Sequence, residues 1–327
     1  MDNDSLSGKN ILVTGGTGFI GTNLVEKLLQ TKSKVSVISN KPPSLPWAKP
    51  IFKNASFFPA DISNEQAISK IIKEINPDVV FHLAATLNRN RTIEAVYENI
   101  KINLQGTMNV AKSLLDSSIE SFVYTSTSDV YGNQTSVPYK ETLKPEPSSP
   151  YAISKYSAET HLKFLHDVYK FPVVILRPFL AYGKYMFTKD LLVSSMIMNV
   201  LKGKDLELTE GKQTRDFIFV EDIAEAAIIA ASTKQAQGKV LNIGTGKETS
   251  VREIVEKILS IFDYPVKAKF GAIPYRTNEI WRMFADNSET KKILGWEPQT
   301  SLNKGLAETI SWIKESYTNH PALFNNL

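Results

Sequence analysis

The sequence contains no cysteine in its 327 residues. Disulfide bonds, thiolate nucleophiles and cysteine-ligated zinc are therefore excluded. The four histidines are scattered without metal-ligand spacing, so no metal site is predicted. No apolar run approaches the roughly 20 residues that a membrane-spanning helix requires, and the polar stretch Met1–Asn10 carries no apolar signal region. We therefore expect a cytoplasmic protein that does not bind a membrane.

The sequence also has no basic patch or basic tail. The net charge is +4, and the lysines and arginines are spread along the chain. This distribution gives no support to nucleic-acid binding. A mild positive excess suits a phosphorylated small molecule, although the signal is weak. With 42% hydrophobic and 22% charged residues, the composition is that of an ordinary globular protein.

Short β-branched runs alternate with longer helical patterns in the first half of the chain. This order predicts an α/β fold, a doubly wound parallel sheet covered by helices on both faces. We expect a dinucleotide-binding Rossmann domain over residues 1–180, with a returning strand near 239–243, and a smaller, interleaved substrate-binding lobe over 181–327. The expected strands are Asn10–Thr14, Lys34–Ser39, Ala55–Pro59, Val79–Leu83, Ser121–Ser126, Val173–Arg177, Asp205–Leu208 and Asp216–Val220.

Capping and turn signals place several other elements. Ser63-Asn64-Glu65-Gln66 has the form of a capping box, with Ser63 as the cap of a helix that runs to Ile75. The proline-rich stretch Lys41–Pro50 is predicted to be a loop. Further helices are expected at Glu221–Ala231, Ser250–Ile261 and Ser301–Lys314.

A glycine-rich turn follows the first expected strand. Gly15, Gly18 and Gly21 permit a tight turn, close approach of the backbone to a pyrophosphate and close helix–strand packing. The helix that follows offers free N–H groups and the positive end of its dipole to phosphates. The order of strand, turn and helix predicts a nicotinamide dinucleotide site. The expected cofactor contacts in this turn are Gly15, Thr17, Gly18, Phe19 and Ile20.

The end of the second strand lacks the acidic residue that commonly binds the adenosine ribose. Ser39, Asn40 and Lys41 stand there instead. A lysine with small polar groups suits a 2′-phosphate, which favours NADP over NAD, although a solvated loop lysine would leave the same pattern. Asp61 and Ile62, after the third strand, are placed to meet the adenine.

Tyr151 and Lys155 form a Tyr-x-x-x-Lys pair in an expected helix that begins at Pro150. Residues four apart share a helix face, so the two side chains point the same way. A nearby ammonium favours the phenolate of a tyrosine, whose ordinary pKa is near 10. Tyr151 is therefore a candidate base that takes a proton from a sugar hydroxyl during hydride transfer.

These patterns together resemble the extended short-chain dehydrogenase/reductase family of nucleotide-sugar epimerases and dehydratases. The resemblance covers nearly the whole chain. It rests on Thr14–Gly21, Phe81–Ala85, Asn103–Thr107, Val130–Gly132, Tyr151–Lys155, Arg177–Phe179, Thr214–Phe217, Asn242–Gly244 and Leu294–Trp296.

The resemblance implies roles for matching positions. Thr127 would hydrogen-bond the reacting sugar oxygen, and Lys155 would also hold the nicotinamide ribose. Leu83, Ala84 and Ala85 would line the cofactor channel. Arg215 and Arg276 would grip the substrate diphosphate, for which a guanidinium is well shaped, and Glu279 would lie near the nucleotide. The family also dimerises through helices equivalent to those around Arg91–Ser117 and Tyr151–Tyr169, so a homodimer is expected.

Two positions depart from the family pattern. Leu180 stands where many relatives carry a substrate-binding asparagine. Ser128 and Asp129 stand where many 4,6-dehydratases carry an Asp-Glu pair that eliminates water. Asp129 is thus either a catalytic base or a residue that fixes the following loop. His82, in an expected strand, is interpreted as a core residue, and Trp281 and Trp296 as packing residues.

The leading functional hypothesis is a nucleotide-sugar 4-epimerase that works through a transient 4-keto sugar. A 4,6-dehydratase that uses Asp129, or a 4-keto-sugar reductase that uses NADPH, is the alternative. A non-catalytic dinucleotide-binding sensor is disfavoured, because such proteins commonly lose the Tyr-Lys pair that is present here at Tyr151 and Lys155.

Overall fold

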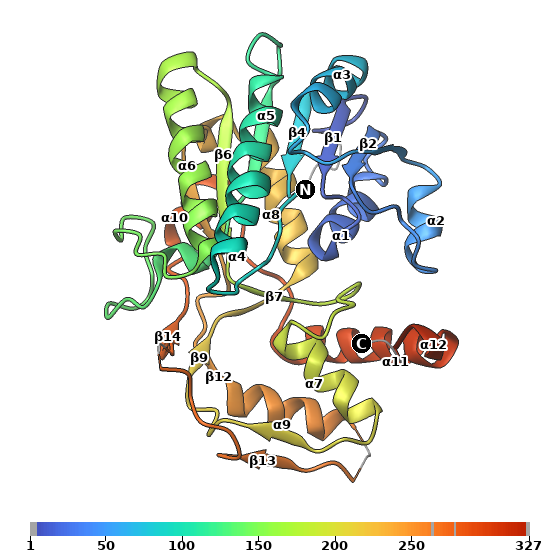
Figure 1. Cartoon of the computed structure of the whole chain (residues 1–327), viewed down its shortest axis with the longest axis vertical. Helices are drawn as coiled ribbons and strands as arrows, with labels where there is room; N and C mark the ends of the chain where they lie inside the picture. Colours follow the sequence, from blue (N-terminus) through green and yellow to red (C-terminus); the bar gives the residue numbers. More distant parts are fainter. Residues whose placement is uncertain (1–4, 263–264, 278, 325–327) are drawn as a thin grey trace.

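The main sheet has seven parallel strands in the order β11-β6-β5-β4-β1-β2-β3 (Figure 1). In this computed structural model the structure describes residues 5–262, 265–277 and 279–324. The strand order confirms the predicted Rossmann-type fold class. The strands are β1 (Asn10–Thr14), β2 (Lys34–Ser39), β3 (Ser56–Pro59), β4 (Val79–His82), β5 (Ser121–Thr125), β6 (Val173–Pro178) and β11 (Val240–Ile243).

Helices cover both faces of this sheet because successive side chains of each strand point to opposite sides. Leu12 and Val80 pack into one core with helices α3, α5 and α6, whereas Ile11 and Val79 pack into the other with α1 and α8. The elements on and beside the sheet are α1 (Phe19–Leu28), α2 (Ala48–Phe52), α3 (Glu65–Ile75), α4 (Ile93–Asn99), the π-helix η1 (Ile100–Gly106), α5 (Thr107–Lys112), the 3-10 helix η2 (Ser128–Tyr131), α6 (Pro150–Tyr169), α8 (Val220–Ser232), the 3-10 helix η3 (Lys234–Ala236) and α10 (Ser288–Leu294).

A second, smaller lobe lies below the carboxyl ends of the sheet strands in Figure 1. Its apolar core joins α7, α9 and α11, with side chains such as Ile197, Ile254 and Ile310 fully buried. Its elements are β7 (Leu180–Tyr182), α7 (Leu192–Leu201), β8 (Leu206–Leu208), β9 (Thr214–Arg215), β10 (Phe217–Phe219), β12 (Thr249–Ser250), α9 (Val251–Ile261), β13 (Ala268–Phe270), β14 (Arg282–Met283), α11 (Leu302–Asn319) and α12 (Pro321–Phe324).

Three local predictions were wrong in detail. The stretch predicted as a loop at Lys41–Pro50 ends in helix α2, which begins at Ala48, and a proline is tolerated in such a first turn. The cap of α3 is Asn64 rather than Ser63, since the Asn64 side chain accepts a hydrogen bond from the N–H of Ala67. Helix α11 continues to Asn319, five residues beyond the predicted end at Lys314.

Across the described residues, no helix is both long enough and apolar enough to cross a membrane.

Candidate active site

Two glycines of the turn between β1 and α1 have no room for a side chain. A Cβ on Gly15, whose φ is +71°, would lie 2.6 Å from the backbone nitrogen of Ala84, and one on Gly21 would lie 2.2 Å from the carbonyl oxygen of Gly15. Gly18 gives α1 no side-chain cap, so N–H groups of the first helical turn stay available for a ligand. This cradle fits a pyrophosphate on the helix N-terminus.

Thr17 ties the glycine turn to the end of β2. Its hydroxyl is 2.7 Å from that of Ser39 and donates to the carbonyl oxygen of Lys41 at 3.0 Å. The side chains of Asn40 and Lys41 are exposed, and the Lys41 ammonium has no ion pair with any described residue. The end of β2 therefore presents a free cation and no carboxylate, as the sequence indicates.

The other predicted cofactor contacts lie along the same edge of the sheet. Asp61 is exposed, and its carboxylate accepts a hydrogen bond from the N–H of Ser63 at 2.8 Å. Ile62 is buried at its side. Leu83 and Ala84 are half-buried and Ala85 is exposed, directly after β4. All follow the carboxyl ends of strands, where parallel sheets bind ligands.

Tyr151 and Lys155 lie on one face of α6, opposite the end of β5. Ser149 caps this helix through the N–H of Ala152, and Pro150 occupies its first turn. Thr127, just after β5, is close enough to the Tyr151 phenol to lower its pKa. The Lys155 ammonium lies 4.2 Å from the centre of the Tyr124 ring. Of the four predicted catalytic side chains, Thr127, Tyr151 and Lys155 are less than a tenth exposed, whereas that of Asp129 is 27% exposed.

Burial opposes charge on both members of the pair. It raises the pKa of Tyr151 to about 12, with a further increase from Asp129 and opposing effects from Arg89 and Thr127. It lowers the pKa of Lys155 to about 7, against the attraction of Glu159. Without ligands the Tyr151 phenol is therefore neutral and Lys155 is only partly charged at neutral pH. Positive charge beside the phenol, from Lys155 or a bound cation, would favour the phenolate.

Asp129 is paired rather than free. Its carboxylate lies 3.0 Å from the guanidinium of Arg89, a residue that the sequence did not single out. The Arg89 guanidinium also lies 5.3 Å from the centre of the Tyr151 ring. The Asp129 backbone N–H donates to the Thr127 hydroxyl at 3.2 Å. Asp129 thus belongs to the candidate site as an ion-paired neighbour of Tyr151.

A buried ion pair that involves the helix of Tyr151 was also not predicted from the sequence. Arg177 of β6 donates to both carboxylate oxygens of Glu159, at 3.0 and 2.6 Å, and the Ser126 hydroxyl donates to the same carboxylate. Glu159 follows Lys155 by four residues, so it lies on the same helix face. The network fixes α6 to the ends of β5 and β6, and so fixes Tyr151 opposite Thr127. The helical spacing of Glu159 was a signal that could have revealed it.

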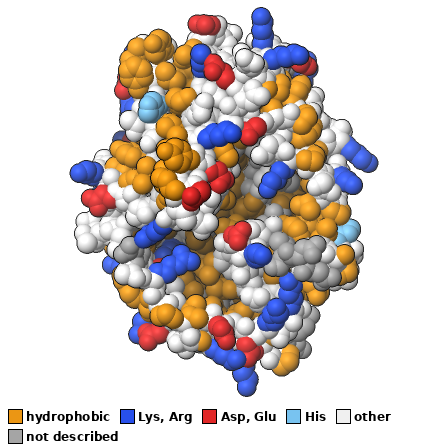
Figure 2. Space-filling view, in the orientation of Figure 1, with side chains coloured by type: hydrophobic (Ala, Val, Ile, Leu, Met, Phe, Trp, Pro, Cys, Tyr) orange, Lys and Arg blue, Asp and Glu red, His pale blue; other side chains and the backbone are white. Residues whose placement is uncertain are grey.

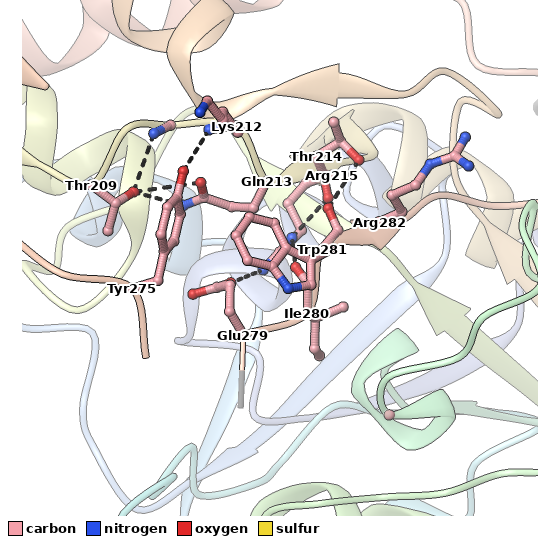
Figure 3. Close-up of polar contacts among 12 residues, drawn as sticks. Thr209, Lys212, Gln213, Thr214, Arg215, Tyr275, Glu279, Ile280, Trp281 and Arg282 are labelled. Atoms are coloured by element: carbon pink, nitrogen blue, oxygen red, sulfur yellow. Dashed lines mark hydrogen bonds and ion pairs between the residues drawn. The ribbon is translucent and has the colours of Figure 1, made fainter. Parts of the chain in front are cut away.

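The two arginines predicted to bind the diphosphate differ in how firmly they are held, and Figure 3 shows the surroundings of Arg215. Arg215 donates to the carbonyl oxygens of Thr214 and Ile280 and forms an ion pair with Glu279 at 2.8 Å. Both Arg215 and Glu279 are largely buried. Arg276 is exposed, and its side chain has no hydrogen bond or ion pair with the residues that the structure describes. The structure therefore joins Arg215 to Glu279 and leaves Arg276 free.

The remaining interpretations have mixed outcomes. His82 is buried between the hydroxyls of Thr14 at 2.7 Å and Thr107 at 2.9 Å, which confirms a core role. Burial lowers its pKa to about 3. Trp296 is buried as predicted, but Trp281 is 47% exposed and, among the described residues, its ring contacts only that of Tyr275, so its assignment as a packing residue was wrong. Leu180, in β7, packs against the apolar core of the lobe.

The Rossmann sheet, its glycine cradle and the buried Tyr-Lys pair define an NAD(P)-dependent enzyme. The chain belongs to the NAD-dependent epimerase/dehydratase family, whose model matches residues 11–244. This confirms the resemblance to extended short-chain dehydrogenases/reductases.

Individual relatives span almost the full chain. A putative UDP-glucose 4-epimerase of Methanocaldococcus jannaschii is 32% identical, over 94% of this chain and 99% of its own length. A dTDP-glucose 4,6-dehydratase of Haemophilus influenzae is 31% identical, over 93% and 97%. The solved UDP-glucuronic acid 4-epimerase of Bacillus cereus, in complex with UDP-glucuronic acid and NAD, has a TM-score of 0.85 at 30% identity, covering 94% of this chain and 99% of that one.

Proposed function

We propose that the protein is a nucleotide-sugar 4-epimerase. The observation that carries the proposal is the state of Asp129 beside Tyr151. Its carboxylate is ion-paired with Arg89 and its neighbour is Ser128, so the Asp-Glu pair of many 4,6-dehydratases is missing, and Tyr151 with Thr127 and Lys155 forms the candidate proton-transfer set among the described residues. That set suffices for oxidation and reduction at one carbon. Elimination of water needs an additional acid and base.

We propose the following roles for the residues of the site. Tyr151 takes the proton of the sugar 4-hydroxyl and later returns it, while Thr127 orients that oxygen. Lys155 supplies positive charge that favours the phenolate. Arg215 and Arg276 bind the diphosphate, for which guanidinium groups are suited, so the sugar can turn while the nucleotide stays fixed. A nicotinamide dinucleotide held by Gly15, Gly18 and Gly21 of the glycine cradle would supply reversible hydride transfer at C4.

The residues at the end of β2 bear on whether the cofactor is NAD or NADP. The free Lys41 and the missing carboxylate after β2 support NADP, whereas the matched Bacillus cereus epimerase was solved with NAD. We propose that Lys41 accepts the 2′-phosphate of NADP. Titration of the protein with NADPH and NADH tests this. Tighter NADPH binding that Lys41→Glu abolishes is expected, and clear preference for NADH contradicts it.

Product analysis separates epimerisation from the alternatives. The protein is incubated with cofactor and a panel of UDP-, GDP-, CDP- and dTDP-sugars, and products are examined by mass spectrometry and by chromatography that resolves 4-epimers. We expect an isomer of unchanged mass and no net consumption of reduced cofactor. A product lighter by one water identifies a dehydratase, and stoichiometric NADPH consumption identifies a reductase.

We also propose that the protein is a homodimer through α4, η1 and α6. Seven large apolar side chains on these helices are between 46% and 69% exposed. Figure 2 shows hydrophobic side chains gathered on this face of the molecule. An apolar surface of this kind is typical of a subunit interface. These side chains are Ile93, Tyr97, Ile100, Ile153, Phe164, Val168 and Tyr169.

The dimer is tested by the mass in solution of matched variants. Tyr97→Glu and Phe164→Glu place a charge in the proposed interface and should yield monomers. Ile273→Glu is the control, because Ile273 is also exposed, at 43%, but lies in the other lobe. A wild-type monomer, or equal masses for all variants, contradicts the proposal. The cytoplasmic location expected from the sequence stays a prediction.

A further inference from the structure

Arg89 links three segments that are distant in the sequence. It lies in the irregular segment between β4 and α4, while Asp129 lies in η2 and Tyr151 in the first turn of α6. Its guanidinium is 3.0 Å from the Asp129 carboxylate and 5.3 Å from the centre of the Tyr151 ring. The second distance is within the range of a cation–π contact. Arg89 is thus the cation between a carboxylate and the candidate base.

The segment that carries Arg89 is anchored on its amino-terminal side. The Asn88 side chain donates to Glu98 at 2.7 Å, and the Asn99 side chain donates to the Asn88 carbonyl oxygen at 2.8 Å. Asp129 is anchored as well, because its N–H donates to the Thr127 hydroxyl. Both ends of the ion pair are therefore held by neighbours, which lowers the entropy that the pair must lose on forming.

The charges around Tyr151 show what the pair does. An unpaired carboxylate beside a phenol disfavours the phenolate, and a cation favours it. Among the surrounding groups, Glu159 and Arg177 neutralise each other and His82 is buried with a pKa near 3. Asp129 and Arg89 act in opposite directions on the pKa of Tyr151. The charged groups that act on Tyr151 are Asp129 and Arg89. Lys155 and Glu159 follow it on α6, and Tyr124 of β5 interacts with both Tyr151 and Glu159.

The pair contributes little to folding. The side chains of Arg89 and Asp129 are 48% and 27% exposed, and ion pairs at such positions add little to stability. Its position next to a buried base is where a local charge has most effect, because the surroundings of Tyr151 screen charge poorly. A role in the reaction is therefore better supported than a role in stability.

We propose that Arg89 is a positioning residue for proton transfer at Tyr151: it holds Asp129 in a neutral pair, so that the sugar hydroxyl meets a base without a competing anion beside it. The proposal rests on the proposed oxidation at C4, which epimerisation and dehydration share as a first step. The same pairing occupies the Asp129 carboxylate. Loss of Arg89 would leave a lone carboxylate next to Tyr151.

The test is a double-mutant cycle read through pH profiles. Wild type, Arg89→Ala, Asp129→Asn and the double variant are compared for kcat/KM and for the rate of hydride transfer in the first half-reaction. Arg89→Ala should lower kcat/KM at neutral pH by roughly tenfold, equivalent to about one unit of pKa, and move the acid limb of the profile to higher pH. The double variant should recover to within about threefold of wild type, and Arg89→Lys should stay close to it.

If Arg89 had only a structural role, the double variant would not recover kcat/KM. If Arg89→Ala and the double variant are equally slow with unshifted profiles, Arg89 acts by another route and the proposal fails. It also fails if Arg89→Ala matches wild type. Because the first half-reaction is measured separately, a dehydrated final product would refute the proposed epimerase while leaving the test of Arg89 valid.

Discussion

Thr127, Tyr151 and Lys155 are each less than a tenth exposed and are fixed at the ends of β5 and α6. Arg276, by contrast, is exposed in a segment without regular structure. The residues proposed for the chemistry thus lie in the sheet domain, and Arg276, proposed for substrate recognition, lies in a loop of the smaller lobe. We infer that the positions of the catalytic side chains are fixed before the substrate binds, whereas contacts between Arg276 and the nucleotide form only on binding.

The largest expected effect is that of removing the Tyr151 hydroxyl. Tyr151→Phe removes the proton acceptor but keeps the ring and its packing. We expect kcat to fall by roughly 10³-fold, as is typical for loss of a general base, with cofactor binding retained. Steady-state kinetics and cofactor titration measure the two effects. A variant that keeps a tenth of wild-type kcat would show that Tyr151 is not the base.

The recognition half should respond in KM rather than kcat. Arg276→Ala removes a side chain with no described partner, so we expect KM for the nucleotide sugar to rise roughly 10- to 100-fold, the equivalent of a charged hydrogen bond, with unchanged melting temperature. Arg215→Ala should raise KM and also lower the melting temperature, since it leaves Glu279 unpaired in a largely buried place. Equal losses of stability would remove the distinction between the two arginines.

A third prediction concerns the stability of the buried Lys155 rather than activity. The folded pKa of Lys155 is about 7, below its ordinary 10.5, so the unfolded chain binds more protons between these values and wild-type stability rises with pH across that range. Lys155→Met should therefore be more stable than wild type by ~2–5 kcal/mol at pH 7, with the gain disappearing near pH 10. Urea unfolding at both pH values measures this. A destabilised variant at pH 7 would show that the buried lysine is better compensated than its surroundings indicate.

The sheet and the Tyr-Lys pair were predictable because both depend on short, periodic patterns. Strand β1 has a continuous apolar run, and the four-residue spacing from Tyr151 to Lys155 reads as one helix face. Arg89 had no such signal, because its contact with Asp129 joins irregular segments 40 positions apart in sequence, from 89 to 129. Trp281 was misassigned for a related reason: the strand β14 that follows it is two residues long, too short for alternation to show which side is buried.

The most direct test of the whole account is the fate of C4 in a UDP-hexose incubated with protein and oxidised cofactor. The account predicts interconversion of the two 4-epimers to a fixed equilibrium ratio, with no change in mass and no build-up of reduced cofactor, and loss of this activity in Tyr151→Phe. A product lighter by one water, or turnover that persists in Tyr151→Phe, would contradict it.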